Sequence, residues 1–476
     1  MHRRNKKCNR TGARTIARAL LSWYVLPATF GLLSISTVQA APGDLLLTLR
    51  PPDLAPFTKF GDALGVVGGN IIVGAPDTHL LDDGLAFVGQ AHVFDGTTGD
   101  LLYSIPHPDP QDRSVFGSAV LGFEDRILIG APGQDVPNEF GDGAVYVFDS
   151  ADGALLKTIP NPNQSGFGSR FGHNLAAAGS KTLTGQSSRF LPTGGRGPIG
   201  SVYLFDPVTG LIEPEILNPA LGDGEGDLFS AGNGVASLGG RPVVGATHAD
   251  IPEQDGSAGR VYVFDDLTGE LLLAIDNPEP TSANLSFIPD WFGFAVAATD
   301  EKIFVGARLD DPHGVEDAGI VYSFDGSTGE LLLTIEPPDP WRRGEFGKSL
   351  AVVGDNILVG AYDTPADGME HAGKAYLFDG ATGELLLEIP NPEPGPDFFG
   401  WQLASFGNDI LVSAIADAVD GAPGHGTVYL FEGVVPEPQT ISLACSGLIV
   451  VAFFVCDRGR RRDRRLEKTR RRGLVD

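Results

Sequence analysis

Acidic side chains that could hold a cation recur in the long loops of this 476-residue chain. Carboxylate oxygens are preferred ligands of Ca²⁺, and acids from neighbouring loops can share one ion. Their spacing is irregular, however, and no loop follows a known calcium-binding pattern, so solvated surface acids are the competing interpretation. No cofactor is required by the sequence, and calcium is the one for which it offers candidate ligands. These are Asp77, Asp82, Asp83, Asp310, Asp311, Asp317, Asp363 and Asp367.

No motif marks a catalytic residue. The sequence contains neither Gly-x-Ser-x-Gly nor His-Glu-x-x-His, and no pair of carboxylates stands out from the many. An active site that draws one residue from each of several repeats would leave no motif either. Five histidines share the acidic loops but occupy different offsets, which predicts ordinary surface histidines rather than a metal or hydrolase site. They are His79, His248, His313, His371 and His425.

Two further groups of side chains suit binding rather than catalysis. Trp291, Trp341 and Trp401 lie in or just after Pro-rich connectors, where they either wedge between neighbouring repeats or stack on sugars and peptides. The loop at 187–200 differs from the others because it contains Arg189 and Arg196 and no acid. It is a candidate site for an anionic partner or a carboxylate.

These loops connect copies of a repeat, of which residues 318–340 are the clearest copy. Two strand-like runs there flank Gly-Ser-Thr-Gly, which predicts a β-hairpin. The acid that ends the first run recurs at Asp95, Asp149, Asp206, Asp265, Asp325, Asp379 and Glu432. An aromatic–small pair precedes each acid, at Phe60-Gly61, Phe116-Gly117, Phe171-Gly172, Phe229-Ser230, Phe292-Gly293, Phe346-Gly347 and Phe399-Gly400. Both markers therefore give seven repeats.

Each repeat contains four strand-like runs, for example 346–354, 356–361, 374–379 and 383–389. The runs are apolar at nearly every position, which is typical of strands covered on both faces. The seventh repeat lacks its fourth run, whereas an unmatched copy of that run occupies 43–53. A ring closes if this first strand joins the last sheet. We therefore predict an all-β, seven-bladed β-propeller of four-stranded antiparallel blades, closed by the N-terminal strand.

Three segments are predicted. Residues 1–40 have the basic and apolar regions of a secretory signal, with cleavage after Ala40, and a signal helix is expected there. The propeller occupies 41–433, and 434–476 contains Pro436-Glu437-Pro438, an apolar helix at 441–455 and an Arg-rich end. This helix is short for a stable span of about 20 residues, so a transient anchor is expected. The net charge of −27 is concentrated between the two basic ends, which argues against nucleic acid and anionic membranes as partners.

Two families resemble these patterns. Phe60-Gly61 with Val73-Gly74-Ala75-Pro76, and Phe116-Gly117 with Ile129-Gly130-Ala131-Pro132, resemble the FG-GAP repeats of integrin α-subunit propellers and their bacterial relatives. The resemblance weakens where the proline is replaced, at Ser187, Thr247, Arg308, Tyr362 and Ile415, and at Gln186. The family's calcium loops do not carry over, because tight turns stand in their place. The tail at 434–476 resembles a PEP-CTERM sorting signal, which implies processing by an exosortase.

The expected function is an exported, non-enzymatic interaction or adhesion module at the cell surface, on the outer membrane or in an extracellular matrix. It would present the face with the long loops to a protein or polysaccharide partner. The export machinery and an exosortase are the other expected partners, and membrane contact is expected only through the C-terminal helix before processing. A secreted propeller hydrolase or lyase acting on polysaccharide is the alternative, and a purely structural matrix component is a third.

Overall fold

The computed structural model describes most of residues 40–434, all within the first of two compact units, Met1–Val434. The second unit, Val435–Asp476, lies outside the described residues. The described ranges are 40–52, 57–79, 84–135, 141–163, 168–186, 200–213, 215–219, 229, 232, 234–251, 258–280, 290–366, 368–416 and 424–434. Within them, no helix is long and apolar enough to cross a membrane.

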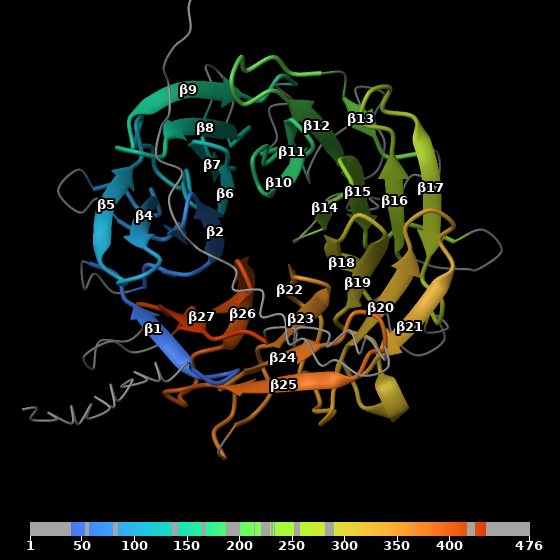
Figure 1. Cartoon of the computed structure of the whole chain (residues 1–476). Coiled ribbons are helices and arrows are strands. Elements are labelled where there is room, and N and C mark those ends of the chain that lie inside the picture. Colours follow the sequence, from blue (N-terminus) through green and yellow to red (C-terminus); the bar gives the residue numbers. More distant parts are fainter. Residues whose placement is uncertain are drawn as a thin grey trace, which may run out of the picture. The chain divides into compact units, whose positions relative to one another are not determined.

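Seven four-stranded antiparallel sheets make up the described fold and are arranged as blades around a common axis (Figure 1). The first strand of each blade lies innermost and contacts the first strands of its neighbours. The prediction of a seven-bladed propeller is therefore confirmed. From blade 1 to blade 7 the strands are β2 (Ala63–Val67), β3 (Asn70–Ala75), β4 (Gln90–Asp95), β5 (Leu101–Pro106); β6 (Ala119–Phe123), β7 (Arg126–Ala131), β8 (Ala144–Asp149), β9 (Leu155–Pro160); β10 (Leu175–Ala178), β11 (Lys181–Gln186), β12 (Ser201–Phe205), β13 (Ile216–Leu217); β14 (Val235–Leu238), β15 (Arg241–Ala246), β16 (Arg260–Phe264), β17 (Leu271–Asp276); β18 (Phe292–Ala298), β19 (Lys302–Ala307), β20 (Ile320–Asp325), β21 (Leu331–Ile335); β22 (Leu350–Val353), β23 (Asn356–Ala361), β24 (Lys374–Phe378), β25 (Leu385–Pro390); β26 (Phe399–Phe406), β27 (Asp409–Ala414), β28 (Thr427–Phe431) and β1 (Leu45–Leu49).

The ring is closed by β1, which pairs antiparallel with β28 as the outer strand of blade 7. The register runs from Leu45 opposite Phe431 to Leu49 opposite Val428. Two further backbone hydrogen bonds extend the pairing, from Gly43 N to Glu432 O (2.8 Å) and from Glu432 N to Asp44 O (2.9 Å). The predicted closing strand is therefore in place.

The Phe-Gly pairs and the Gly-Ala pairs recur because they form the contacts within and between blades. Each Phe is fully buried and packs on the aromatic side chains of the third strand of its own blade; Phe346, for example, lies 5.9 Å from Tyr376 and 5.8 Å from Phe378 between ring centroids. The Gly of Gly-Ala lies against the Phe-Gly glycine of the next blade. A Cβ added at Gly74 would lie 2.0 Å from the carbonyl oxygen of Gly117. A side chain at this position would push the two blades apart.

The acids that end the third strands fix the hairpins on the opposite face of the ring from the long loops. Asp325 Oδ1 accepts hydrogen bonds from the backbone N–H groups of Ser327 (2.9 Å) and Thr328 (2.8 Å). Hydrogen bonds from the Ser327 side chain and from this turn lower the pKa of Asp325 to about 2. Equivalent bonds occur at Asp95, Asp206, Asp265 and Asp379. These acids therefore have a structural role in the hairpin turns.

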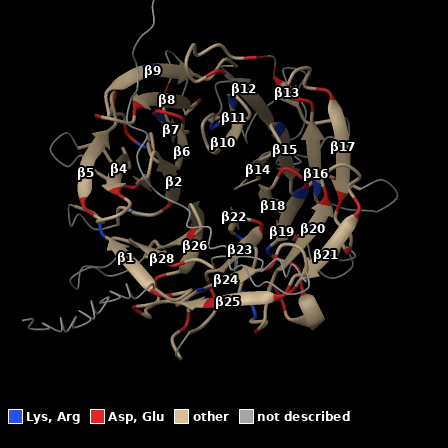
Figure 2. Ribbon diagram, in the orientation of Figure 1, with Lys and Arg blue, Asp and Glu red and all other residues tan. Residues whose placement is uncertain are grey.

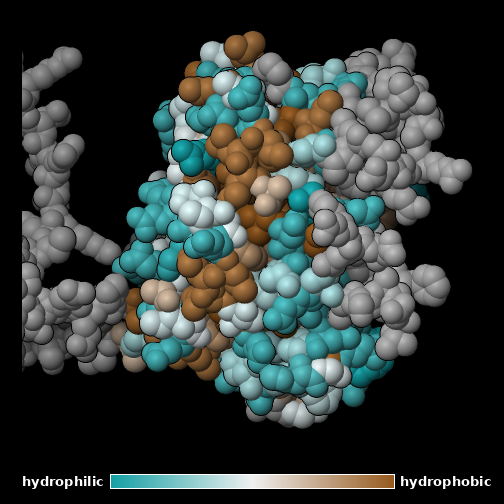
Figure 3. Space-filling view, turned by 90° about the vertical axis from the view of Figure 1, so that its right-hand side faces the viewer, coloured by the Kyte–Doolittle hydropathy of each residue, from teal (hydrophilic) through white to brown (hydrophobic). Residues whose placement is uncertain are grey.

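The fourth strands differ from the prediction that the strands are covered on both faces. Third strands such as β20 are buried along their length, but fourth strands are exposed at the first two positions. Leu271, Leu272, Leu331 and Leu332 are each 44–49% exposed. These strands form the outer edges of the blades, where no next sheet covers them. Figure 3 shows apolar patches on the outer side of the ring, over β17 and β21.

Candidate binding site

The connections from second to third strand and those between blades lie on one face of the ring, because antiparallel strands alternate in direction. Lys59 belongs to the connector that enters blade 1, and Asp77 follows the second strand of the same blade. Their side chains form an ion pair of 3.1 Å between Nζ and Oδ2. We call this face the loop face, and the opposite one the hairpin face.

Three positions in each repeat place side chains around the axis on the loop face, and we call them together the mouth. The first position precedes the Phe-Gly pair, the second follows it, and the third follows Gly-Ala. In the described residues the first position holds Lys59, Val115, Arg170, Trp291, Glu345 and Phe398, the second Asp62, Ser118, His173, Phe294, Lys348 and Trp401, and the third Pro76, Pro132, Thr247, Arg308, Tyr362 and Ile415.

The first mouth position has a strained backbone. All six described residues there have positive φ angles, between 46° for Val115 and 61° for Phe398. Residues other than glycine avoid this conformation, and β-branched valine does so most strongly. The backbone conformation is the same at all six positions although the side chains differ. The fold therefore keeps this conformation at a cost in stability.

Blades 5 to 7 fill their part of the mouth with cations stacked on aromatic rings. The Arg308 guanidinium lies 4.3 Å from the Trp291 ring centroid and 4.5 Å from that of Phe294, and it pairs with Glu345. Lys348 Nζ lies 3.1 Å from the Trp401 ring centroid. Such contacts offset part of the cost of burying the two cations between the blades.

Trp401 joins blades 6, 7 and 1 at the mouth. Its carbonyl oxygen accepts a hydrogen bond from Lys348 Nζ (3.0 Å), and its indole Nε1 donates to Asp62 Oδ1 (3.0 Å). Burial lowers the pKa of Lys348 to about 7, and burial also raises the pKa of Asp62. The interpretation of Trp401 as a wedge between repeats is confirmed by these contacts.

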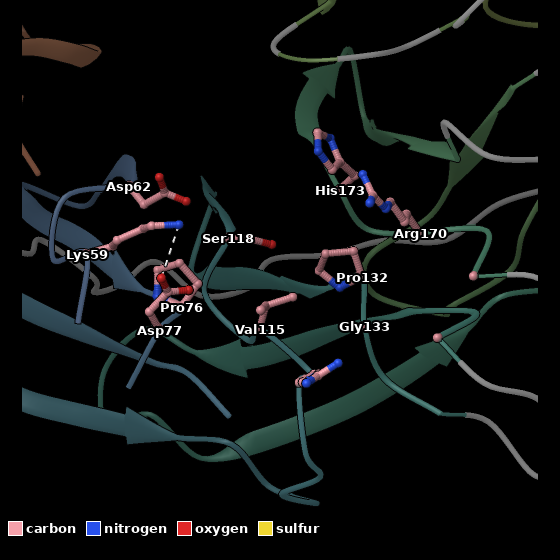
Figure 4. Close-up of a pocket in the computed structure, with 13 residues that line it drawn as sticks. Lys59, Asp62, Pro76, Asp77, Val115, Ser118, Pro132, Gly133, Arg170 and His173 are labelled. Atoms are coloured by element: carbon pink, nitrogen blue, oxygen red, sulfur yellow. Dashed lines mark ion pairs between the residues drawn. The ribbon is translucent and has the colours of Figure 1, made fainter. Parts of the chain in front are cut away.

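A cavity of about 730 Å³ opens at the mouth between blades 1, 2 and 3. Lys59, Asp62 and Asp77 lie on one wall, and Arg170 and His173 on the other (Figure 4). Blade 2 forms the region between the walls, with Val115, Ser118, Pro132, Gly133 and Arg113. Burial and the nearby Arg170 lower the pKa of His173 to about 4, so this imidazole is neutral near pH 7. We call this space the polar cavity.

A second cavity, of about 850 Å³, lies beside the polar cavity and shares Lys59 and Asp77 with it. Its other lining residues come from blade 7 and from the entrance to blade 1, and most are apolar: Phe57, Pro394, Pro396, Phe398 and Ile415 among them. Phe57 is 60% exposed. The two cavities together form a continuous surface with an apolar part and a charged part, which we call the loop-face groove.

The structure gives the described calcium candidates hydrogen-bond and ion-pair partners within the protein. Asp310 accepts a hydrogen bond from Tyr322 Oη (2.8 Å), and burial raises its pKa to about 6. Asp311 Oδ1 accepts the backbone N–H of Asp317 (2.7 Å). Asp363 pairs with His371, and Asp77 with Lys59. Within the described residues no three potential metal ligands cluster, and Asp82, Asp83 and Asp367 lie outside those residues.

The loop histidines and the other two tryptophans differ in how far they are buried. His313 is an exposed surface residue, whereas His425 is fully buried, so the surface prediction is wrong for His425. The reason is that residue 425 faces the seam of the ring, where its backbone carbonyl accepts hydrogen bonds from Phe60 N and Thr58 Oγ1. Trp291 lies 5.5 Å from His248 of blade 4 between ring centroids, which fits a wedge, while Trp341 is exposed.

Several predictions concern residues outside the described ranges. They are the signal helix and its cleavage after Ala40, the loop with Arg189 and Arg196, the Pro436-Glu437-Pro438 motif and the C-terminal helix. In the sequence, Arg308 and Tyr362 stand out only as departures from the Gly-Ala-Pro motif. No sequence pattern marks Arg113, Arg170 or Lys348 as functional residues. Aligning the repeats on Phe-Gly would have located all the mouth positions.

The fold is a seven-bladed β-propeller with two adjoining cavities on its loop face. The family model of the FG-GAP repeat matches residues 333–378, which run from the end of β21 through β24. Together with the seven blades, this match supports an FG-GAP β-propeller. Comparison with curated proteins gives no match.

Proposed function

We propose that the protein is an exported interaction module that binds a protein or polysaccharide partner of the cell surface or extracellular matrix through the loop-face groove. One observation carries this proposal: the repeats share their framework residues but not their mouth residues. The described second mouth positions hold an acid, an alcohol, an imidazole, a phenyl ring, an amine and an indole. Three of these side chains, Asp62, Ser118 and His173, line the polar cavity. Side chains that vary on a shared framework are typical of a surface that recognises a ligand.

The hairpin face, unlike the mouth, has nearly the same residues in each described turn. Its turns repeat one pattern, in which an acid is followed by a Gly that ends the turn with positive φ, as at Gly99, Gly153, Gly210, Gly269, Gly329 and Gly383. The first mouth position keeps its strained backbone with larger side chains instead. Strain that is maintained at this position in all six blades where it is described points to a role in binding.

Export and sorting are part of the proposal and rest on sequence. The signal-like residues 1–40 favour secretion, and Pro436-Glu437-Pro438 followed by an apolar run and arginines favours an exosortase-dependent route to the surface. Edman sequencing of the protein recovered outside the cells tests the first point, since cleavage after Ala40 leaves Ala41 as the first residue. A mature N-terminus elsewhere or retention in the cytoplasm would contradict it.

Binding is tested with two matched substitutions in the exported protein. Phe57→Ser removes an exposed side chain from the groove, and Leu267→Ser removes an equally prominent one (78% exposed) from the hairpin face. We expect fluorescently labelled wild-type and Leu267→Ser protein to bind cells or matrix of the producing organism saturably, and Phe57→Ser to bind at least about tenfold more weakly. Equal binding of both variants would refute the proposal, and loss of polymer viscosity on incubation would indicate an enzyme instead.

A further inference from the structure

We propose that the polar cavity between blades 1, 2 and 3 binds the carboxylated sugar residues of an acidic polysaccharide. This inference rests on the proposed function and specifies the chemistry of the partner. The ligand is a uronic acid unit, which combines one carboxylate with several hydroxyl groups. Arg170, on the wall opposite Asp62 and Asp77, and Arg113 hold the carboxylate, while Ser118, Asp62 and the Lys59–Asp77 pair face the hydroxyls.

The three cations are unusual for this protein. Acidic residues outnumber basic ones by 61 to 34 in the whole chain, and acidic positions are spread around the ring (Figure 2). Yet Lys59, Arg113 and Arg170 all line one cavity, and all three have positive φ angles, of 51°, 60° and 60°. Arg113 is 79% exposed at its side chain, and its ion pair with the adjacent Asp112 is long, at 3.8 Å. Arg113 is therefore open to a ligand, whereas Lys59 lines the cavity as an ion pair with Asp77. The backbone of all three cations is strained.

The two acids of the polar cavity decide which anion fits. Asp77 is paired with Lys59, and Asp62 receives the Trp401 indole N–H and is close to Lys348. A second ligand carboxylate beside them would be repelled, and a ligand ammonium group would meet Lys59. Neutral hydroxyl groups donate hydrogen bonds to carboxylates without either penalty. One carboxylate surrounded by hydroxyls therefore satisfies the polar cavity better than an acidic peptide, which brings several carboxylates and few hydroxyls.

The remaining lining residues suit a sugar as well. Pro76, Val115 and Pro132 give the polar cavity an apolar surface against which the C–H face of a pyranose ring can pack. At about 730 Å³ the cavity lies within the range of small-molecule sites. The polar cavity and the second, mostly apolar cavity adjoin at Lys59 and Asp77, which line both. A polymer chain bound in the polar cavity can therefore continue along the loop-face groove.

The test uses polygalacturonate as the probe, with its methyl ester as the uncharged counterpart and poly-glutamate as an anion without ring hydroxyls. Isothermal titration of the exported protein is expected to show saturable binding to polygalacturonate and at least about tenfold weaker binding to the other two polymers. Ester binding of equal strength, poly-glutamate binding of equal strength, or no binding to polygalacturonate would each overturn the inference.

Matched variants identify the residues. Arg113→Gln and Arg170→Gln are expected to weaken polygalacturonate binding at least about tenfold each. Arg343→Gln is the control, because Arg343 occupies the position of Arg113 in blade 6, with φ of 63°, but lies outside both cavities. Equal losses in all three variants would refute the assignment. Cell binding that is sensitive to Phe57→Ser but not accompanied by polygalacturonate binding would overturn this inference alone and leave the proposed function standing.

Discussion

Closure of the ring by β1 can be tested at Leu49. This side chain is 1% exposed and packs in the cluster that joins blades 7 and 1, with Phe60, Val428 and Leu430. Leu45 lies on the same strand but is 45% exposed. The pair Leu49→Ala and Leu45→Ala therefore separates the contribution of the seam from that of the strand itself.

The expected magnitudes follow from burial. Leu→Ala at a fully buried site costs about 2–5 kcal/mol, of which part is the cavity left behind. At Leu45 nearly half of the side chain is already in water, so we expect a loss of less than about 1 kcal/mol. For a ring of this size the unfolding entropy is about 0.8 kcal/mol per kelvin, so a loss of about 3 kcal/mol at Leu49 lowers Tm by about 4 °C.

Calorimetry and urea unfolding measure both variants. Because repeat proteins can unfold in parts, the scans should be compared with near-UV circular dichroism before free energies are assigned. If Leu49→Ala destabilises the protein no more than Leu45→Ala, the seam does not contribute to stability as its burial implies. The account of ring closure would then be wrong.

Two further predictions concern the blade contacts and acid stability. Gly74→Ala places a Cβ 2.0 Å from Gly117 O, so we expect it to lower the free energy of unfolding by at least about 3 kcal/mol or to prevent folding. At Gly68 an added Cβ meets nothing within 4 Å, and we expect Gly68→Ala to cost only about 1–2 kcal/mol, because of its positive φ. Similar losses for both variants in urea unfolding would contradict this expectation. Burial lowers the pKa of His107 to about 4, so its folded form releases a proton that the unfolded chain keeps, and stability falls as pH decreases from about 6.5 towards 4. His107→Asn should fold normally, because the equivalent position in other blades holds Asn161, Asn277 or Asn391, which accept the same hydrogen bond from the backbone N–H two residues ahead. Without the imidazole, the variant should lose less stability between about pH 6.5 and 4 than the wild type. An unchanged dependence of stability on pH would contradict this expectation.

The sequence was sufficient for the architecture because the framework residues are repeated. Seven Phe-led pairs and the matching acids marked the blades, and the surplus run at 43–53 marked the closing strand. The prediction failed for the fourth strands. Their leucines resemble core residues in the sequence, but edge position depends on the absence of a neighbouring sheet, which composition does not record.

The candidate binding site was harder to predict for a related reason. Mouth residues such as Arg113 and Lys348 carry no common identity from blade to blade, so a search for repeated ligands concentrated on the loop acids instead. What the mouth residues share is position and, at the first site, a backbone conformation that is visible only in the structure. Pairings across blades, such as Trp401 with Asp62, depend on the curvature of the ring and have no local sequence signal.

The bond from Trp401 to Asp62 and the pairing of β1 with β28 join segments from the two ends of the propeller, more than 330 residues apart in the sequence. Contacts between such distant segments form late in folding. The apolar half of the groove needs both Phe57 and Phe398, so it does not exist until the whole ring has been made. A nascent or truncated chain thus lacks the apolar part of the groove on which the proposed binding depends.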